Sequence, residues 1–169
     1  AALMTGTKYE TKLISGIYEI LVNRTGAEIM QENLETLGEI SYTDQEITYA
    51  NAILKEAGKP QLGINGKVTP IQETLPAQGG STDVGDVSQV VPTIRMSATV
   101  AADGGPWHSW AVVACTGMSI GHKGMIYAAK ALSMTMADLY KNPKLVEAVK
   151  ADYKKNKMPE AYKPRILSG

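Results

Sequence analysis

The apolar residues of the chain follow two spacings, one typical of strands and one typical of helices. Over residues 8–20, β-branched and aromatic residues partly alternate with polar ones, interrupted at Gly16, which predicts an extended strand with a bend at the glycine. Residues 87–100 predict a second strand, whose start is limited by Pro92. The short apolar run at residues 110–116 predicts a third strand, buried on both faces.

Four other segments have helical spacing or a recognisable first turn. Thr25 and Thr43 each stand three residues before a glutamate, the capping-box pattern that opens a helix. Residues 123–140 place apolar side chains every three or four positions and predict a long helix. Asn142 and Pro143 predict the start of a last helix, because asparagine caps well and proline fits the first turn. The combination predicts an α/β fold, with a mostly buried sheet covered by these helices.

The charge balance and the cysteine content exclude several classes of protein. The chain has 169 residues with 17 basic and 17 acidic side chains, so its formal net charge is zero. This balance disfavours a nucleic-acid binder, which normally carries a basic surface. No apolar run is long enough to cross a bilayer, so no membrane partner is expected. The single cysteine, Cys115, excludes an internal disulfide and fits a reducing compartment, so we expect a cytoplasmic protein.

Three polar loops beside apolar segments are the candidate sites. Residues 79–86 combine glycines with hydroxyl and carboxylate side chains, and they suit either a substrate loop or a plain helix cap. Residues 104–110 place His108 between two tryptophans, where it can serve in a pocket or be a hydrogen-bonded structural histidine. Residues 119–124 open the long helix with a histidine and a lysine, an arrangement that suits either anion binding or simple capping.

The chain does not contain a complete catalytic motif. His108 and His122 are its only histidines, whereas a zinc site needs three or four ligands drawn from cysteine, histidine and carboxylates. The compact motifs of zinc peptidases, phosphate-binding loops and serine hydrolases are also absent from the sequence. An enzymatic function therefore cannot rest on this chain alone.

Four sequence segments carry a resemblance to a known family. They are Val-Asn-Arg-Thr at residues 22–25, Gly-Ser-Thr-Asp-Val-Gly-Asp-Val-Ser at 80–88, Trp-His-Ser-Trp at 107–110 and Ser-Ile-Gly-His-Lys-Gly-Met at 119–125. Together they resemble the metal-dependent amidohydrolases and peptidases of the aminoacylase and carboxypeptidase type, in the branch of aminobenzoyl-glutamate utilisation proteins. The resemblance covers nearly the whole chain, and the second and fourth segments are specific to that branch.

This resemblance implies a division into domains. In such enzymes a metallopeptidase-like catalytic domain is interrupted by a smaller lid domain, which also forms a homodimer. Residues 1–20 would then be the last strand of the lid, and residues 21–169 the C-terminal part of the catalytic domain. The family keeps most metal ligands and the catalytic glutamate in its N-terminal half. By this resemblance the chain is the C-terminal portion of a longer enzyme and is inactive alone.

The resemblance also implies the cofactor and part of the site. Two bridged divalent metal ions, commonly zinc, polarise an amide carbonyl and activate a water molecule in such enzymes. One ligand is a histidine late in the chain, which we assign to His108, with His122 as the alternative. Ser81, Thr82 and Asp83 match the family's loop near the substrate.

Asn23 and Arg24 complete the substrate-side residues that the resemblance implies. They lie where the lid meets the catalytic domain, and an arginine there suits either a substrate carboxylate or a structural ion pair between domains. The expected function is hydrolysis of an amide bond in a small molecule, an N-acyl or aminobenzoyl amino acid. The alternative is a stand-alone, noncatalytic module that holds a small anion with the loop at Gly79 and the helix start at Gly121.

Overall fold

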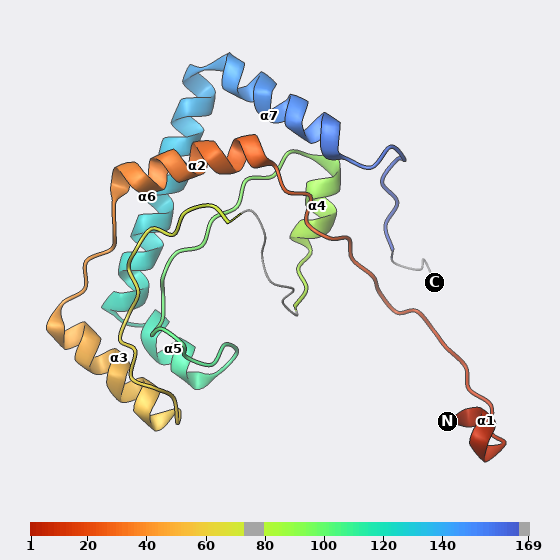
Figure 1. The fold of residues 1–169 in the computed structure, drawn as a ribbon, viewed down its shortest axis with the longest axis horizontal. Coiled ribbons are helices and arrows are strands. Elements are labelled where there is room, and N and C mark those ends of the chain that lie inside the picture. Colours follow the sequence, from red (N-terminus) through yellow and green to blue (C-terminus); the bar gives the residue numbers. More distant parts are fainter. Residues whose placement is uncertain (73–79, 166–169) are drawn as a thin grey trace.

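In the computed structural model the chain folds into helices joined by long extended segments, and the structure describes residues 1–72 and 80–165. The regular elements in these ranges are α1 (Ala2–Thr5), α2 (Arg24–Leu37), α3 (Asp44–Glu56), α4 (Val84–Val90), α5 (Trp110–Thr116), α6 (Ser119–Lys141) and α7 (Pro143–Asn156). Figure 1 shows α2 to α7 as an arc, with α3 and α5 at one end, α2, α6 and α7 in the middle and α4 at the other end, while α1 lies apart at the end of the leading segment. None of these helices has the length and apolar character needed to span a bilayer.

The predicted α/β fold is wrong, because the described residues form no strand and no sheet. The clearest difference lies at residues 110–116, which form α5 instead of a buried strand. The hydroxyl of Ser109 accepts a hydrogen bond from the amide of Ala111 (3.3 Å) and so caps a helix. Ala111 and Cys115 then lie one turn apart, and both are buried. A seven-residue apolar run fits a strand or a short helix, and here the cap and the packing favour the helix.

The other two predicted strands are also wrong. Residues 8–20 and 92–100 form no regular element, because a strand needs a neighbour that shares its backbone hydrogen bonds. Among the described residues, neither segment has such a neighbour. The beginning of the second prediction is helical, because residues 84–90 form α4. The leading segment extends away from the arc in Figure 1, and the division into residues 1–20 and 21–169 stays a prediction.

Two helix starts are confirmed by their capping contacts. Thr43 and Glu46 form a complete capping box at α3, in which each side chain accepts a hydrogen bond from the other residue's backbone amide. Asn142 caps α7 through the amide of Lys144, with Pro143 in the first turn. The local sequence is therefore sufficient to place these two helices.

The other two predicted helices are shifted in their first residues. Helix α2 begins before Thr25, because Asn23 is the cap and its Oδ1 accepts from the amide of Gly26 (2.8 Å). The long helix predicted over residues 123–140 begins at residue 119 and is α6. Asparagine is among the best N-cap residues, so the signal for the α2 start was present in the sequence.

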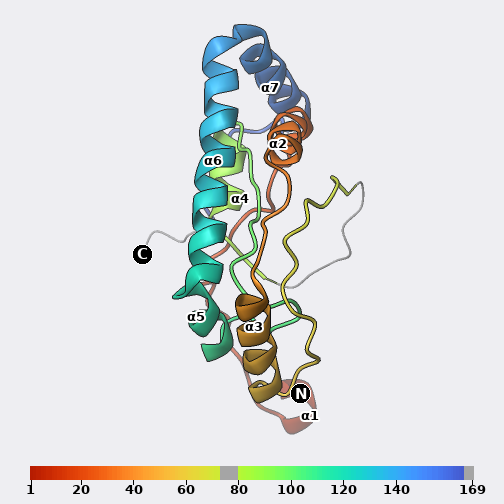
Figure 2. The same cartoon turned by 90° about the vertical axis from the view of Figure 1, so that its left-hand side faces the viewer.

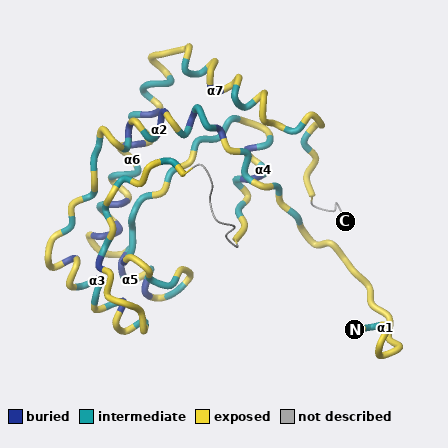
Figure 3. The backbone as a smooth tube through the Cα atoms, in the orientation of Figure 1, coloured by how far each residue is buried: buried dark blue, intermediate teal, exposed yellow. Residues whose placement is uncertain are grey.

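Two groups of buried residues hold the helices together, and Figure 3 marks buried positions in dark blue along α3, α5, α6 and α2. The first joins α3, α5 and the start of α6, and consists of Ala50, Leu54, Ala102, Cys115 and Ile120. In the second, α2 lies across α6, as Figure 2 also shows. Here Thr135 donates to the sulfur of Met30 (3.5 Å), and Asn33 donates to the carboxylate of Asp138 (2.8 Å). Because each group is small, the stability of the fold depends strongly on single contacts.

Gly124 allows α6 to approach the extended segment at residues 99 and 100. A Cβ at this position would overlap the carbonyl oxygen of Thr99 and lie 2.8 Å from Cγ1 of Val100. We expect Gly124→Ala to lower the free energy of unfolding by about 2 kcal/mol in urea titrations, as is usual for overpacking. Gly117→Ala is the matched control, because a Cβ there meets its nearest atom at an ordinary 3.5 Å. An equal loss in both variants would contradict this account.

Candidate functional site

His108 lies on the loop that leads into α5, and no hydrogen bond or ion pair in the described part of the chain holds its ring. Its backbone has a φ of 58°, a left-handed conformation that is uncommon for a residue other than glycine. The side chain is exposed, and the neighbouring Trp107 and Trp110 are 71% and 53% exposed. The structure thus does not show the buried, hydrogen-bonded histidine of the structural alternative. It shows an imidazole that is open to a ligand from outside the chain.

His122 lies in the first turn of α6 and is also exposed. It faces a cavity of about 480 Å³ that Lys123 and Lys130 line as well. The ammonium group of Lys123 is not available to bind an anion from solution, because it donates a hydrogen bond to the carboxylate of Glu46 (2.6 Å). This internal pairing removes one cation from the helix start and so weakens the anion-binding alternative.

The loop before α4 holds the three residues assigned to the substrate. Ser81 and Asp83 are exposed, whereas Thr82 is half-buried and its hydroxyl accepts from the amide of Val84 (3.4 Å). Asp83 stands at the N-cap position of α4 but makes no side-chain capping bond. Its carboxylate and the Ser81 hydroxyl are therefore accessible to a ligand. Gly79, at the start of the predicted loop, lies outside the described residues.

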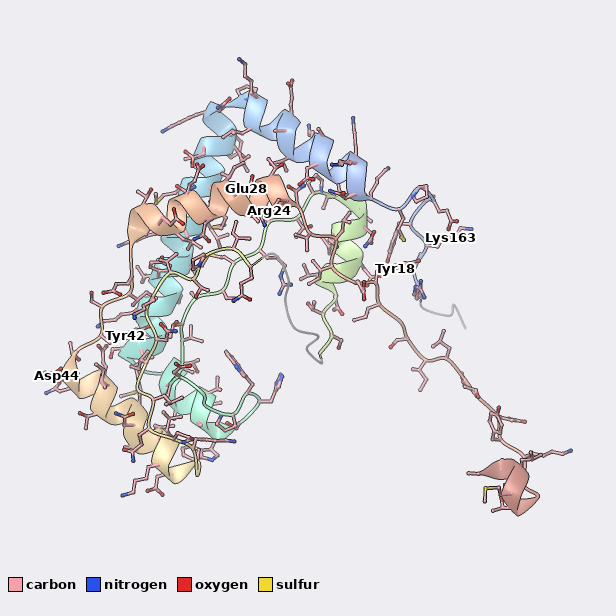
Figure 4. The ribbon with its side chains drawn as sticks, viewed as in Figure 1. Tyr18, Arg24, Glu28, Tyr42, Asp44 and Lys163 are labelled. Carbon is pink, nitrogen blue, oxygen red and sulfur yellow. The ribbon has the colours of Figure 1, made fainter. Side chains whose placement is uncertain are left out.

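Asn23 and Arg24 have different surroundings although they are adjacent. Asn23 is buried, its Oδ1 caps α2, and its Nδ2 donates to the carbonyl of Val149 in α7 (2.8 Å). Its amide thus fixes the start of α2 against α7. Arg24 is half-exposed and its Nε lies 2.8 Å from Oε1 of Glu28, one turn further along α2 (Figure 4). The arginine is therefore presented at the surface from a rigidly held helix start.

The structure brings some of these segments to one side of the molecule. In Figure 1 the segment that leads into α4 and the loop before α5 both border the inner side of the arc. No hydrogen bond in the described residues joins His108 to Ser81, Thr82 or Asp83. No group of three or more histidine, cysteine or carboxylate side chains in the described ranges is placed to hold a metal ion. The exposed imidazole of His108 can supply one ligand to a metal ion, but the described residues do not supply the other ligands of a complete metal site.

Sequence reasoning missed a buried ionic cluster between α3 and α6. The carboxylate of Glu46, only 8% exposed, accepts from Lys123 (2.6 Å), from the Ser119 hydroxyl (2.6 Å) and from the amide of Thr43 (2.7 Å). The hydrogen bonds from Lys123 and Ser119 lower the pKa of Glu46 from 4.5 to about 2. Burial and the nearby charge of Glu46 raise the pKa of Tyr42 to about 12. The capping box predicted the contact between Thr43 and Glu46, whereas the contact with Lys123 joins residues 77 positions apart and has no local sequence signal.

Comparison with known proteins relates the chain distantly to a subunit of a hydrolase. A similar protein is one of the subunits of p-aminobenzoyl-glutamate hydrolase from Escherichia coli (strain K12), with 29% identity over 178 aligned residues. The alignment covers 90% of this chain but only 37% of that protein, so the chain spans little more than a third of its relative's length. No family model and no solved structure matches the chain. The chain is therefore a distant relative of a hydrolase subunit.

Proposed function

We propose that this chain is the C-terminal part of a metal-dependent amidohydrolase that cleaves an amide bond in an N-acyl or aminobenzoyl amino acid. The observation that carries the proposal is the similarity to the p-aminobenzoyl-glutamate hydrolase subunit, which extends over 90% of the chain. The exposed loop residues His108, Ser81 and Asp83 support it, because they are accessible to a ligand. Homodimerisation through a lid domain and a cytoplasmic location belong to the same proposal.

His108 is the metal ligand in this proposal. When bound, divalent metal ions, for example two zinc ions, polarise the amide carbonyl and lower the pKa of a bound water molecule. The open imidazole supplies one ligand, and the remaining ligands come from outside this chain. The left-handed backbone at His108 is consistent with this role, since uncommon backbone conformations cluster at functional sites.

Arg24 is the residue that recognises the substrate carboxylate. A guanidinium group binds a carboxylate through two parallel hydrogen bonds, which fixes the orientation of the substrate. Its contact with Glu28 involves side chains that are 42% and 54% exposed, and such surface pairs contribute little to stability. Asn23 contributes by holding the helix start that carries Arg24.

The isolated 169-residue chain is expected to be inactive and to bind zinc only weakly. A single imidazole with scattered carboxylates does not form a closed or dinuclear site. Isothermal titration calorimetry with zinc ions, together with an assay for p-aminobenzoate release from p-aminobenzoyl-glutamate, measures both properties. Tight stoichiometric zinc binding by the isolated chain would contradict the proposed origin of the other ligands.

The decisive experiment uses the longest polypeptide that the gene encodes. An upstream reading frame that supplies histidine and carboxylate ligands is expected, and that polypeptide should hydrolyse p-aminobenzoyl-glutamate or N-acyl amino acids when loaded with zinc. A start codon immediately before Ala1 would contradict the proposal. So would the absence of hydrolysis by a zinc-loaded longer polypeptide across both substrate classes.

A further inference from the structure

Helix α4 is attached to the extended segment at residues 18–21 by contacts along its length. The Ser88 hydroxyl accepts from the amide of Leu21 (2.8 Å), and the side-chain amide of Gln89 donates to the carbonyl of Glu19 (3.0 Å). A Cβ at Gly85 would overlap the carbonyl of Tyr18, so helix and segment lie in direct backbone contact. Helix α4 therefore packs directly against this segment.

These contacts connect the two segments assigned to the substrate, residues 81–83 and residues 23–24, through the elements next to them in the sequence. The segment 81–83 directly precedes α4, and Asn23 and Arg24 follow residues 18–21 after a single intervening residue. A change in the position of α4 against the extended segment would therefore change the position of Ser81 and Asp83 relative to Arg24.

Residues 162–165, a distant part of the sequence, contact both α4 and the extended segment at residues 18–21. The Tyr162 hydroxyl donates to Oδ1 of Asp86 (2.8 Å), while Oδ2 of the same carboxylate accepts from the amide of Tyr18 (3.4 Å). The Tyr18 hydroxyl in turn donates to the carbonyl of Lys163 (3.0 Å), and Figure 4 shows these two residues beside each other. The guanidinium carbon of Arg165 lies 4.4 Å from the centroid of the Tyr18 ring.

Asp86 is the shared residue of this arrangement. One of its carboxylate oxygens is bound to the C-terminal segment and the other to residue 18, so α4, the extended segment and the C-terminal segment meet at a single side chain. The hydrogen bond to Asp86 raises the pKa of Tyr162, because it stabilises the neutral phenol. The C-terminal segment is otherwise largely exposed, so its attachment depends on these few contacts.

We propose that residues 162–165 form a clasp that acts through Asp86 to set the position of α4, and hence of Ser81 and Asp83 relative to Arg24. Tyr162 and Asp86 are positioning residues in this account, since neither needs to contact a substrate. The proposal deepens the proposed function, because the segments it aligns are those assigned to the substrate.

Nuclear magnetic resonance of the ¹⁵N-labelled 169-residue chain tests the clasp without any substrate. Tyr162→Phe removes one hydroxyl, and Tyr140→Phe is the matched control because Tyr140 is 83% exposed and forms no hydrogen bond among the described residues. We expect Tyr162→Phe to shift the amide signals of Ser81 and Asp83 and to speed hydrogen exchange of the Leu21 amide about tenfold. Asp86→Asn should shift the same signals, and Tyr140→Phe should leave them unchanged.

The outcomes separate the clasp from a purely local contact. Shifts confined to residues near Tyr162, with the signals of Ser81 and Asp83 unchanged, would overturn the proposal. A general rise in exchange that includes α6 would also overturn it, since that result indicates global destabilisation rather than movement of α4.

The functional readout distinguishes failure of the clasp from failure of the proposed activity. In an active longer polypeptide, Tyr162→Phe should raise KM for p-aminobenzoyl-glutamate about fivefold and leave kcat within about twofold, because substrate alignment changes while the reacting groups do not. If that polypeptide is inactive but the signals of Ser81 and Asp83 still shift in the variant, the proposed function fails and the clasp stands. If it is active and Tyr162→Phe alters neither the signals nor KM, the clasp fails and the function stands.

Discussion

Replacing Lys123 by alanine is expected to lower the free energy of unfolding by about 3 kcal/mol at neutral pH, because it leaves the charge of Glu46 buried without its cationic partner. Glu46 is 8% exposed and lies in the first turn of α3, where its carboxylate contacts α6, so water cannot replace the lost ammonium group fully. Lys123 itself is 35% exposed, which places the loss toward the lower end of the range for a broken buried pair. Urea unfolding at pH 7 measures the difference.

Two further variants show whether the loss comes from the ion pair. Lys130→Ala removes an exposed lysine from the same helix and should cost less than about 0.5 kcal/mol. The double variant Lys123→Met with Glu46→Leu should recover part of the loss, because it removes both charges and leaves apolar side chains in their place. A loss in Lys123→Ala that is no larger than in Lys130→Ala would mean that the pair does not stabilise the fold.

The same pair gives the chain a defined sensitivity to acid. The pKa of Glu46 is lowered from 4.5 to about 2 in the folded chain, so the folded state favours the charged carboxylate. The stability this provides is fully present above the unfolded pKa and is lost as the pH falls from 4.5 toward 2. In Lys123→Ala the pKa of Glu46 should rise toward its ordinary value, so the variant should lose less stability than the wild type over this window.

The capping patterns show how much of the fold can be predicted from local sequence. Thr43 with Glu46, and Asn142 with Pro143, contain all the groups that satisfy the first turns of α3 and α7, and both helices begin as predicted. At α2 two caps compete within three residues. Asn23 is the cap because its amide also reaches Val149 of α7, and this contact is not visible in the local pattern.

The strands could not be predicted reliably because a strand is defined by its partner. The alternation at residues 87–100 predicted a strand, but pairing depends on a second segment, which the described residues do not provide, and the first residues of this range belong to α4. Residues 110–116 show the opposite problem. Their apolar side chains suit either element, and the Ser109 cap together with the buried positions of Ala111 and Cys115 favours the helix.

In the candidate site, too, some features could be predicted from the local sequence, whereas others depend on contacts between distant residues. The exposure of Ser81, Asp83 and His108 agrees with their prediction as loop residues, since glycine-rich polar stretches lie at the surface. The contacts that position them could not be predicted. Asp86 is bound by Tyr162, and Glu46 by Lys123, across 76 and 77 residues of sequence, and such pairs are fixed only by the folded chain.

The two histidines decide whether this chain contributes to metal binding. In the longer polypeptide, His108→Ala is expected to reduce turnover by at least about a thousandfold and to lower the bound zinc per chain, because loss of one ligand removes both affinity and geometry. The ring of His108 is exposed and has no hydrogen bond, ion pair or ring contact among the described residues, so the substitution should leave the unfolding free energy within about 0.5 kcal/mol of the wild type.

His122→Ala is the matched control, because His122 is also exposed and has no side-chain hydrogen bond in the described part of the chain. Its metal content should stay close to that of the wild type even if turnover falls. Elemental analysis of the purified variants, combined with urea unfolding, separates loss of a ligand from loss of the fold. The reverse pattern would assign the ligand to His122. Unchanged zinc content in both variants would show that neither histidine is a metal ligand, and the proposed metal role of this chain would then be wrong.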